Sequence, residues 1–171
     1  AFKLSNNSIA AYVLPQFVNA DSQLYSVKNE YNGVVIESGF ADKQFFFGKG
    51  AGGHPTGAAV LSDIAALRYD YRYEYKKYHQ KNGLIHTDRV SLEVYLRYQH
   101  EYTLEKLQIE NISERFSRHD YKYVIGNVSL KSLLENKELL LNKDVFIAQT
   151  GRIIYTEQDI KAIAEEGILV N

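Results

Sequence analysis

The sequence predicts an α+β fold in two parts, and three observations carry this prediction. Short runs rich in β-branched and aromatic residues fill the chain before residue 48, which is typical of strands. The apolar period then changes from two to about 3.6, which indicates a long helix. Strand-like and helix-like segments alternate over the rest of the chain. We therefore predict one domain over residues 1–81, a partial mixed or antiparallel sheet with a long helix, and a small α+β domain over residues 82–171.

The composition excludes several classes of protein. The 171 residues are 45% hydrophobic and 24% charged, as in ordinary folded domains. The 20 Lys and Arg residues balance 21 Asp and Glu residues without gathering on one segment, so we expect neither nucleic acid nor a membrane as a partner. The absence of Cys excludes disulfides and favours a cytoplasmic protein. The chain also lacks Met and enters apolar patterning almost at once, from which we expect part of a longer protein.

The first domain begins with strands. Residues 10–18 read as a strand in which Pro15 marks an edge or a bulge, because proline cannot donate to a central ladder. Residues 32–40 and 43–47 are expected to form a hairpin. A sheet this small needs another layer packed on it.

The long helix is expected to begin near Pro55 and to end at Asn82-Gly83. Its first half, GAAVLSDIAAL, is small and apolar almost all round, so we expect it to be buried on several sides. Its second half alternates Tyr with charged residues and suits a surface connector, which places the domain boundary near Lys81.

The second domain is predicted to alternate strands and helices. Residues 90–98 alternate apolar with polar residues, as in a half-buried strand. This spacing favours a ferredoxin-like βαββαβ sandwich. The further elements are a helix at 103–116, a strand at 121–125, a helical segment at 128–141, a strand at 144–150, a helix at 156–166 and a strand at 168–170.

The run from Gly48 to Val60, GKGAGGHPTGAAV, is the strongest candidate for a functional motif. A strand leads into it and a helix follows, so backbone N–H groups at the helix N-terminus can face an anion or a cofactor. The expected acidic residue of a dinucleotide-binding fingerprint is absent, because Asp70 falls within the helix, and no phosphate-loop GK[ST] is present. A turn that needs glycine only for packing stays open as the alternative.

The wider pattern resembles the homoserine dehydrogenases. That family carries a motif similar to G-x-G-A-G-x-x-P-T-A-x-A-V-x-x-D, preceded by an Asn before an apolar strand. Here the segment Gly48–Asp63 matches the motif, with Gly57 in place of the usual Ala, and Asn32 precedes Gly33-Val34-Val35. The resemblance covers residues 9–68.

The resemblance implies an oxidoreductase that interconverts L-aspartate 4-semialdehyde and L-homoserine with NAD(H) or NADP(H), in threonine and methionine biosynthesis. It implies that Gly50, Ala51 and Gly52 contact the cofactor near its nicotinamide. The family's catalytic Lys and homoserine-binding acids lie upstream, so no catalytic residue is expected in this chain. The resemblance further implies a missing N-terminal Rossmann domain in cis and a homodimer that uses the strands before Gly48. This chain alone is expected to bind no NAD(P) and to turn over no substrate.

Other polar residues are weaker candidates. His54, beside the helix N-terminus, is expected to face solvent rather than the cofactor. Glu37 and Asp42 flank the hairpin without a basic or metal partner nearby in sequence, which favours surface residues. The remaining histidines lack metal-ligand spacing, so no metal site is predicted.

The second domain is similar to the ACT domains that end many homoserine dehydrogenases and bind an amino acid effector. The turn of an ACT domain normally carries a glycine that opens the backbone to the ligand, whereas this chain has Gln99-His100-Glu101-Tyr102-Thr103 there. A structural or oligomerisation role for the ACT-like extension is therefore at least as well supported. A stand-alone amino-acid-binding regulatory module stays open as the alternative for the whole chain.

Overall fold

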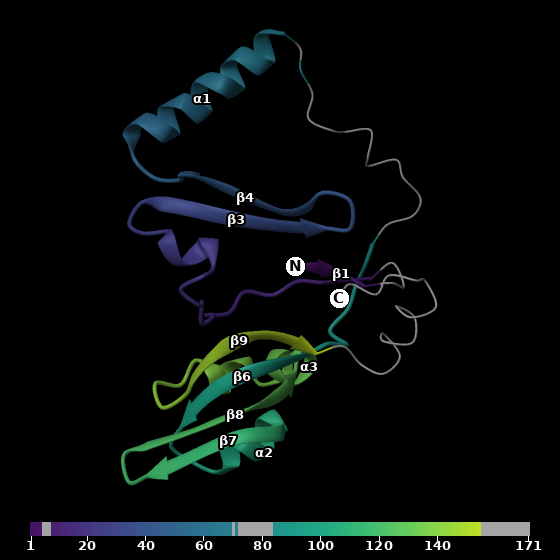
Figure 1. The fold of residues 1–171 in the computed structure, drawn as a ribbon, viewed down its shortest axis with the longest axis vertical. Coiled ribbons are helices and arrows are strands. Elements are labelled where there is room, and N and C mark those ends of the chain that lie inside the picture. The colour runs from purple at the N-terminus through teal and green to yellow at the C-terminus, as the bar shows by residue number, and fades with distance from the viewer. Residues whose placement is uncertain (5–7, 70, 72–83, 155–171) are drawn as a thin grey trace. The chain divides into compact units, whose positions relative to one another are not determined.

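The computed structural model describes residues 1–4, 8–69, 71 and 84–154 (Figure 1). These residues form a mixed α+β structure with several small sheets and few helices. They fall into two compact units, one of residues 18–81 and one of residues 1–17 together with 82–171. No helix among the described residues combines the length and apolarity needed to cross a membrane.

The unit of residues 18–81 is a hairpin followed by a helix (Figure 1). The hairpin predicted at residues 32–47 is confirmed, with antiparallel pairing from Tyr31↔Lys49 to Ser38↔Asp42. At the hairpin turn Asp42 has a φ of 48°, a conformation that Asp tolerates better than most residues. The elements are η1 (Gln23–Ser26), β3 (Tyr31–Ser38), β4 (Asp42–Lys49) and α1 (Gly53–Arg68).

Helix α1 differs from the sequence prediction in its burial. The expectation that its first half is buried on several sides is wrong, because none of its residues is buried. Its large apolar side chains are exposed, Ile64 by 57% and Leu67 by 76%. An apolar sequence indicates a surface that needs cover, but it does not indicate which part of a protein provides it. The second half of the predicted helix lies outside the described residues.

The other unit contains a four-stranded sheet in the order β7-β8-β6-β9, in which every neighbouring pair is antiparallel. Strand β8 therefore lies between β6 and β7, although it follows both of them in the chain. The elements in chain order are β6 (Ser91–Tyr98), α2 (Tyr102–Leu107), β7 (Glu110–Arg118), β8 (Tyr121–Ser129), α3 (Leu130–Glu135), α4 (Lys137–Leu140) and β9 (Phe146–Ile154).

The core of this unit lies between one face of the sheet and its helices. The predicted alternation of strand β6 is confirmed, since Leu92, Val94 and Leu96 are fully buried. Helices α2 and α3 meet over this face, where the buried Ser132 hydroxyl donates a 2.8 Å hydrogen bond to the carbonyl of Leu107. The Ser129 hydroxyl accepts from the Ser132 N–H and so caps the start of α3.

Residues 1–17 pack in the same unit as this sheet. They contribute β1 (Phe2–Lys3) and β2 (Ser8–Ala10), and β2 pairs in parallel with β5 (Ile85–His86). Leu4 and Ala10 belong to the same core cluster as β6. The strand predicted over residues 10–18 is wrong for most of its length, because only an isolated parallel bridge joins Gln16 to Gln149. The carbonyl of Pro15 accepts from the Gln149 N–H there, which a proline can do without an N–H of its own.

The helix predicted over residues 103–116 is also wrong beyond Leu107. Helix α2 ends at Gln108, which has a left-handed φ of 52°, and β7 begins at Glu110. The apolar spacing that includes Ile112 and Phe116 is compatible with a helix and with a twisted edge strand. Pairing with β8 makes this segment a strand. The strands predicted at 121–125 and 144–150 and the helical segment at 128–141 are confirmed with shifted bounds. The elements predicted after residue 155 lie outside the described residues.

The packing of residues 1–17 predicts the effect of Leu4→Ala. Leu4 is 3% exposed, and removing a buried Leu side chain costs about 2 to 5 kcal/mol of folding free energy. Leu141→Ala is the matched control, because Leu141 is 84% exposed and its loss should cost less than about 0.5 kcal/mol. Urea unfolding followed by circular dichroism measures both. Equal stability of the two variants would show that residues 1–17 are not part of this core.

Candidate functional site

The candidate site is the turn between β4 and α1, where two glycines have distinct structural roles. Gly52 precedes the helix with φ 113° and ψ 157°, a backbone conformation that side chains rarely allow. Gly50 lies against Asn32 of the paired strand, so closely that a Cβ there would lie 1.6 Å from the Asn32 Nδ2 atom. The Gly50 N–H also donates to the carbonyl of Glu30 at 3.2 Å. A side chain at Gly50 would therefore collide with Asn32, and one at Gly52 would be strained by the positive φ although it has room.

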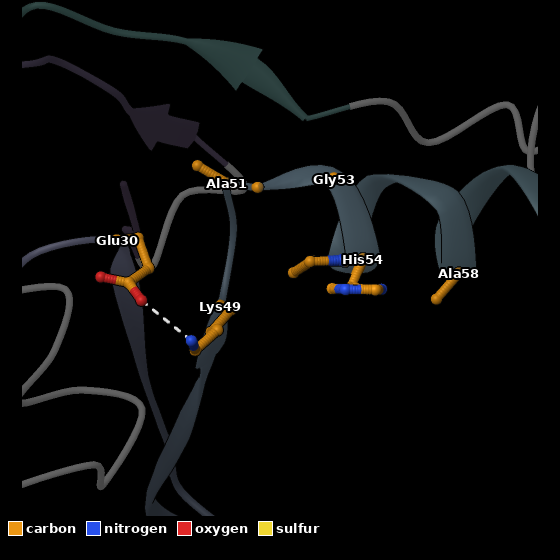
Figure 2. A pocket seen from close by; sticks show the side chains of 8 residues that line it. Glu30, Lys49, Ala51, Gly53, His54 and Ala58 are labelled. Carbon is orange, nitrogen blue, oxygen red and sulfur yellow. Dashed lines mark ion pairs between the residues drawn. The ribbon is translucent and has the colours of Figure 1, made fainter.

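A shallow open hollow of about 590 Å³ lies beside this turn (Figure 2). Of the three residues predicted to contact a cofactor, Ala51 and Gly52 line the hollow, and Gly50 instead holds the turn against Asn32. The full lining is Glu30, Lys49, Ala51, Gly52, Gly53, His54, Pro55 and Ala58.

An ion pair and a helix end set the electrostatics of the hollow. The Lys49 Nζ atom lies 2.9 Å from the Glu30 Oε1 atom, with both side chains about half exposed, and Figure 2 shows the two groups pointing toward each other. The hydrogen bond from Lys49 holds the pKa of the Glu30 carboxyl below its ordinary value of 4.5, and a backbone hydrogen bond acts in the same direction. Helix α1 begins at this hollow with no acidic residue in its first turn and no side-chain cap, so its positive dipole end is uncompensated there.

Sequence reasoning missed Glu30 and Lys49 as lining residues. The signal that identifies them is cross-strand register, because Tyr31 pairs with Lys49 and so places Glu30 beside the end of β4. Lys49 also lies over the Tyr31 ring, with its Nζ atom 5.2 Å from the ring centroid. Register of this kind becomes visible only once the hairpin turn is known.

Of the other candidate residues in the described part of the chain, only His54 lines the hollow. His54 lies in the first turn of α1 and is exposed. Glu37 and Asp42 sit near the opposite end of the hairpin, where Glu37 pairs across the strands with Lys43. In the described part of the chain, no three His, Asp or Glu side chains come together as a metal site would require. His79 lies outside that part.

The turn lies in a segment that is similar in sequence to known proteins. A sequence model for homoserine dehydrogenase matches residues 1–65, which include the whole turn and most of α1. The N-terminal part of the chain is related to homoserine dehydrogenases. The enzyme of Corynebacterium glutamicum is 37% identical over 62 residues, which are 36% of this chain and 14% of that enzyme. The enzyme of Mycobacterium tuberculosis is 39% identical over 56 residues, 33% of this chain and 13% of the relative. That of Synechocystis is 40% identical over 52 residues, 30% of this chain and 12% of the relative.

The ion pair beside the turn predicts a change in the pKa of Glu30. Lys49→Met removes the main cause that lowers this pKa, so the pKa should rise toward 4.5. In the unchanged protein, the stabilising effect of the pair is present at neutral pH and is lost as the pH falls through the pKa of Glu30. An NMR titration of the Glu30 side-chain carboxyl carbon measures the shift. Lys43→Met, on the same strand, is the control and should leave the Glu30 pKa unchanged; equal shifts in both variants would contradict the local pairing.

Proposed function

We propose that this chain is the C-terminal part of a homoserine dehydrogenase, which interconverts L-aspartate 4-semialdehyde and L-homoserine with NAD(H) or NADP(H). The observation that carries the proposal is the turn at Gly50–Gly52, which carries no side chain larger than the methyl group of Ala51 and lies inside the segment that matches the family. The chain spans 14% of the length of the Corynebacterium glutamicum enzyme that it matches, so the remaining parts of the active site belong to other residues of the whole protein. We place that protein in the cytoplasm and in threonine and methionine biosynthesis.

The geometry of the turn suits one wall of a nicotinamide site. A bound NAD(P)H supplies the hydride that reduces the aldehyde. The residues of this chain bring backbone close to the cofactor and keep side chains away, which Gly52 does through its positive φ and Ala51 through its small side chain. The start of α1 presents the positive end of its dipole to the hollow, which suits an anionic cofactor, and the charge of Lys49 is balanced by Glu30.

The exposed apolar surface of α1 supports the same proposal. Val60, Leu61 and Ile64 are each more than half exposed, which is unusual for apolar residues in a folded helix. In the proposed enzyme this helix packs on the Rossmann domain upstream of this chain, and the strands before Gly48 contribute to a homodimer. The catalytic residues lie in the upstream region, so this chain alone has no activity.

A chimeric enzyme tests the proposed function. The segment of the Corynebacterium glutamicum enzyme that aligns with this chain is replaced by the aligned residues of this chain. We expect the chimera to reduce L-aspartate 4-semialdehyde with NADPH or NADH. Adding Gly52→Ala should lower its kcat/KM at least about tenfold, because the alanine strains the turn beside the cofactor.

The control for this chimera is Gly57→Ala. An added Cβ at Gly57 meets nothing within 4 Å, and alanine in a helix interior is favoured over glycine by about 0.5 to 1 kcal/mol. This variant should keep its activity and melt at the same or a higher temperature. A chimera that folds, as judged by circular dichroism, and is inactive with both cofactors would refute the proposed function of the segment.

The four-stranded unit supports a second proposal, an ACT-like, ferredoxin-like module. Its support is the βαββαβ element order with β8 inserted between β6 and β7. The turn after β6 has no positive φ among residues 99–103 and ties Glu101 to Arg115 at 2.8 Å, so it offers side chains rather than open backbone to an effector.

Titration calorimetry tests whether this module binds an amino acid. Threonine, methionine and lysine are titrated into the full chain. We expect no binding heat for an enzyme part whose extension is structural. Saturable heat with one of them, abolished by Glu101→Gln and kept in Glu135→Gln on the exposed surface of α3, would instead favour a stand-alone amino-acid-binding regulatory module.

A further inference from the structure

The face of the four-stranded sheet opposite α2 and α3 carries a continuous set of aromatic rings. Tyr95 of β6 and Tyr123 of β8 lie with ring centroids 5.0 Å apart, and Phe116 of β7 stacks on Tyr123 at 5.5 Å. The set, called here the aromatic face, extends over all four strands and onto the segment beside β9. Its members are Phe17, Tyr95, Phe116, Tyr121, Tyr123 and Phe146.

Half of the rings of the aromatic face are exposed, and the other three, Tyr95, Phe116 and Tyr123, are half-buried. Phe17 is 52% exposed, Tyr121 43% and Phe146 39%. Two of its Tyr hydroxyls, Tyr95 and Tyr121, bond to each other, and the Tyr123 hydroxyl donates to Glu114. Burial raises the pKa of Tyr95 to about 12, so this hydroxyl stays neutral at physiological pH. The charge of the face therefore comes from its Arg and Glu side chains.

These charges are separated along the strands. Arg118 pairs with Tyr121 next to the β7–β8 turn, and Arg97 pairs with Tyr123 one row further on. Glu114 lies in the next row, opposite Ile125, and Glu93 and Glu110 lie in the row beyond, on either side of Asn127. The guanidinium groups lie over rings of the same face, Arg118 over Phe116 at 5.4 Å and Arg97 over Phe146 at 5.9 Å. One end of the aromatic face is therefore basic and the other acidic, and most of the rings lie in the same rows as the two Arg side chains.

We propose that the aromatic face binds the aromatic face of a second copy of this chain, with the strands of the two sheets running in opposite directions. A two-fold axis that lies across the strands places β7 over its symmetry mate and reverses its direction. Arg118 of each copy then faces the half of β7 that carries Glu114 in the other. This surface is distinct from the strands before Gly48 to which the dehydrogenase dimer is assigned above.

The size and the charge of the face favour this partner. Four strands of up to nine residues, at about 3.4 Å per residue and about 4.8 Å between strands, cover roughly 550 Å². Two copies together bury roughly 1,100 Å², close to the roughly 1,000 Å² that a specific interface needs. An interface of this size belongs to the weak, transient end of specific association, for which we expect dimerisation at about 1 to 100 µM. Single-stranded nucleic acid also stacks on aromatic sheets, but it requires a basic surface, and here two Arg face three Glu.

A charge-swap experiment on the full chain tests the proposal. Sedimentation equilibrium measures the dimer dissociation constant of the unchanged protein and of Arg118→Glu, Glu114→Arg and the double variant. Each single variant should raise the constant at least about tenfold, because like charges then face each other, and the double variant should restore it. Within one copy the two positions are about 13 Å apart on the strand, so a restored dimer cannot come from a new pair inside one copy. Lys131→Glu on α3 makes the same change of charge on the helix side and should have no effect.

Cross-linking locates the interface independently. The chain has no cysteine, so Ile125→Cys introduces a single thiol in the middle of the face and Lys131→Cys a single thiol on α3. A short bismaleimide should give a covalent dimer with the first variant and not with the second. Three results would overturn the proposal: a monomer at every concentration up to about ten times the expected range, a dimer insensitive to the Arg118 and Glu114 changes, or binding of a labelled single-stranded oligonucleotide that Arg118→Glu abolishes.

Discussion

Strand β6 is the element on which the structure around the four-stranded sheet depends, because it is paired on both edges and one of its faces is fully buried in the core. Its even-numbered residues, Leu92 to Tyr98, are buried against the helices, and its odd-numbered residues belong to the opposite face. The strand period of two assigns both sets at once. A register slip of one residue would expose the core and bury Glu93, Tyr95 and Arg97 together, so the register of β6 is strongly determined. The register of β6 therefore determines both which residues enter the core and which residues form the aromatic face.

Residues 18–81 are organised by a different constraint. Among their described members no side chain is fully buried, and an isolated hairpin is only marginally stable in water. What is determined here is local: the ladder of β3 and β4 brings Asn32 beside Gly50, and the positive φ of Gly52 directs the chain into α1. This geometry requires only the hydrogen bonds of the β3–β4 ladder and glycine at positions 50 and 52. The apolar side chains of α1 find no comparable cover within the described residues, which is the physical reason to seek it in the rest of the protein.

The sequence predicts the elements whose signal is local. Alternation identifies β6, aromatic and β-branched runs identify the hairpin, and the glycines with Pro55 identify the start of α1. It fails where pairing with distant residues decides. Residues 110–118 have an apolar spacing that permits a helix, and β8 makes them a strand. Residues 11–17 look like a strand, and the ladder partner that would make them one is limited to Gln149.

The candidate site shows the same division between local and distant signals. The glycines of the turn are recognisable from the motif alone, because their requirement is conformational and belongs to single residues. Glu30 and Lys49 are not, since nothing in either sequence neighbourhood shows that the ends of β3 and β4 meet. The separation of charge on the aromatic face is equally hidden, because Arg97, Glu114 and Arg118 come from two strands whose order in the sheet differs from their order in the chain.

The boundary of the segment that matches the family does not coincide with the boundaries of the compact units in this chain. The family match ends at residue 65, whereas the compact units divide after residues 17 and 81. Residues 1–17, although inside the matched segment, bury Leu4 and Ala10 in the core of the four-stranded unit and bond through Pro15 and Phe17 to Gln149 of β9. The segment related to dehydrogenases therefore has two structural parts. Its glycine turn forms without a hydrophobic core, and its short N-terminal strands contribute to the core of the four-stranded unit. A substitution in residues 1–17 acts on the stability of the sheet, and a substitution in residues 48–57 acts on the geometry of the turn.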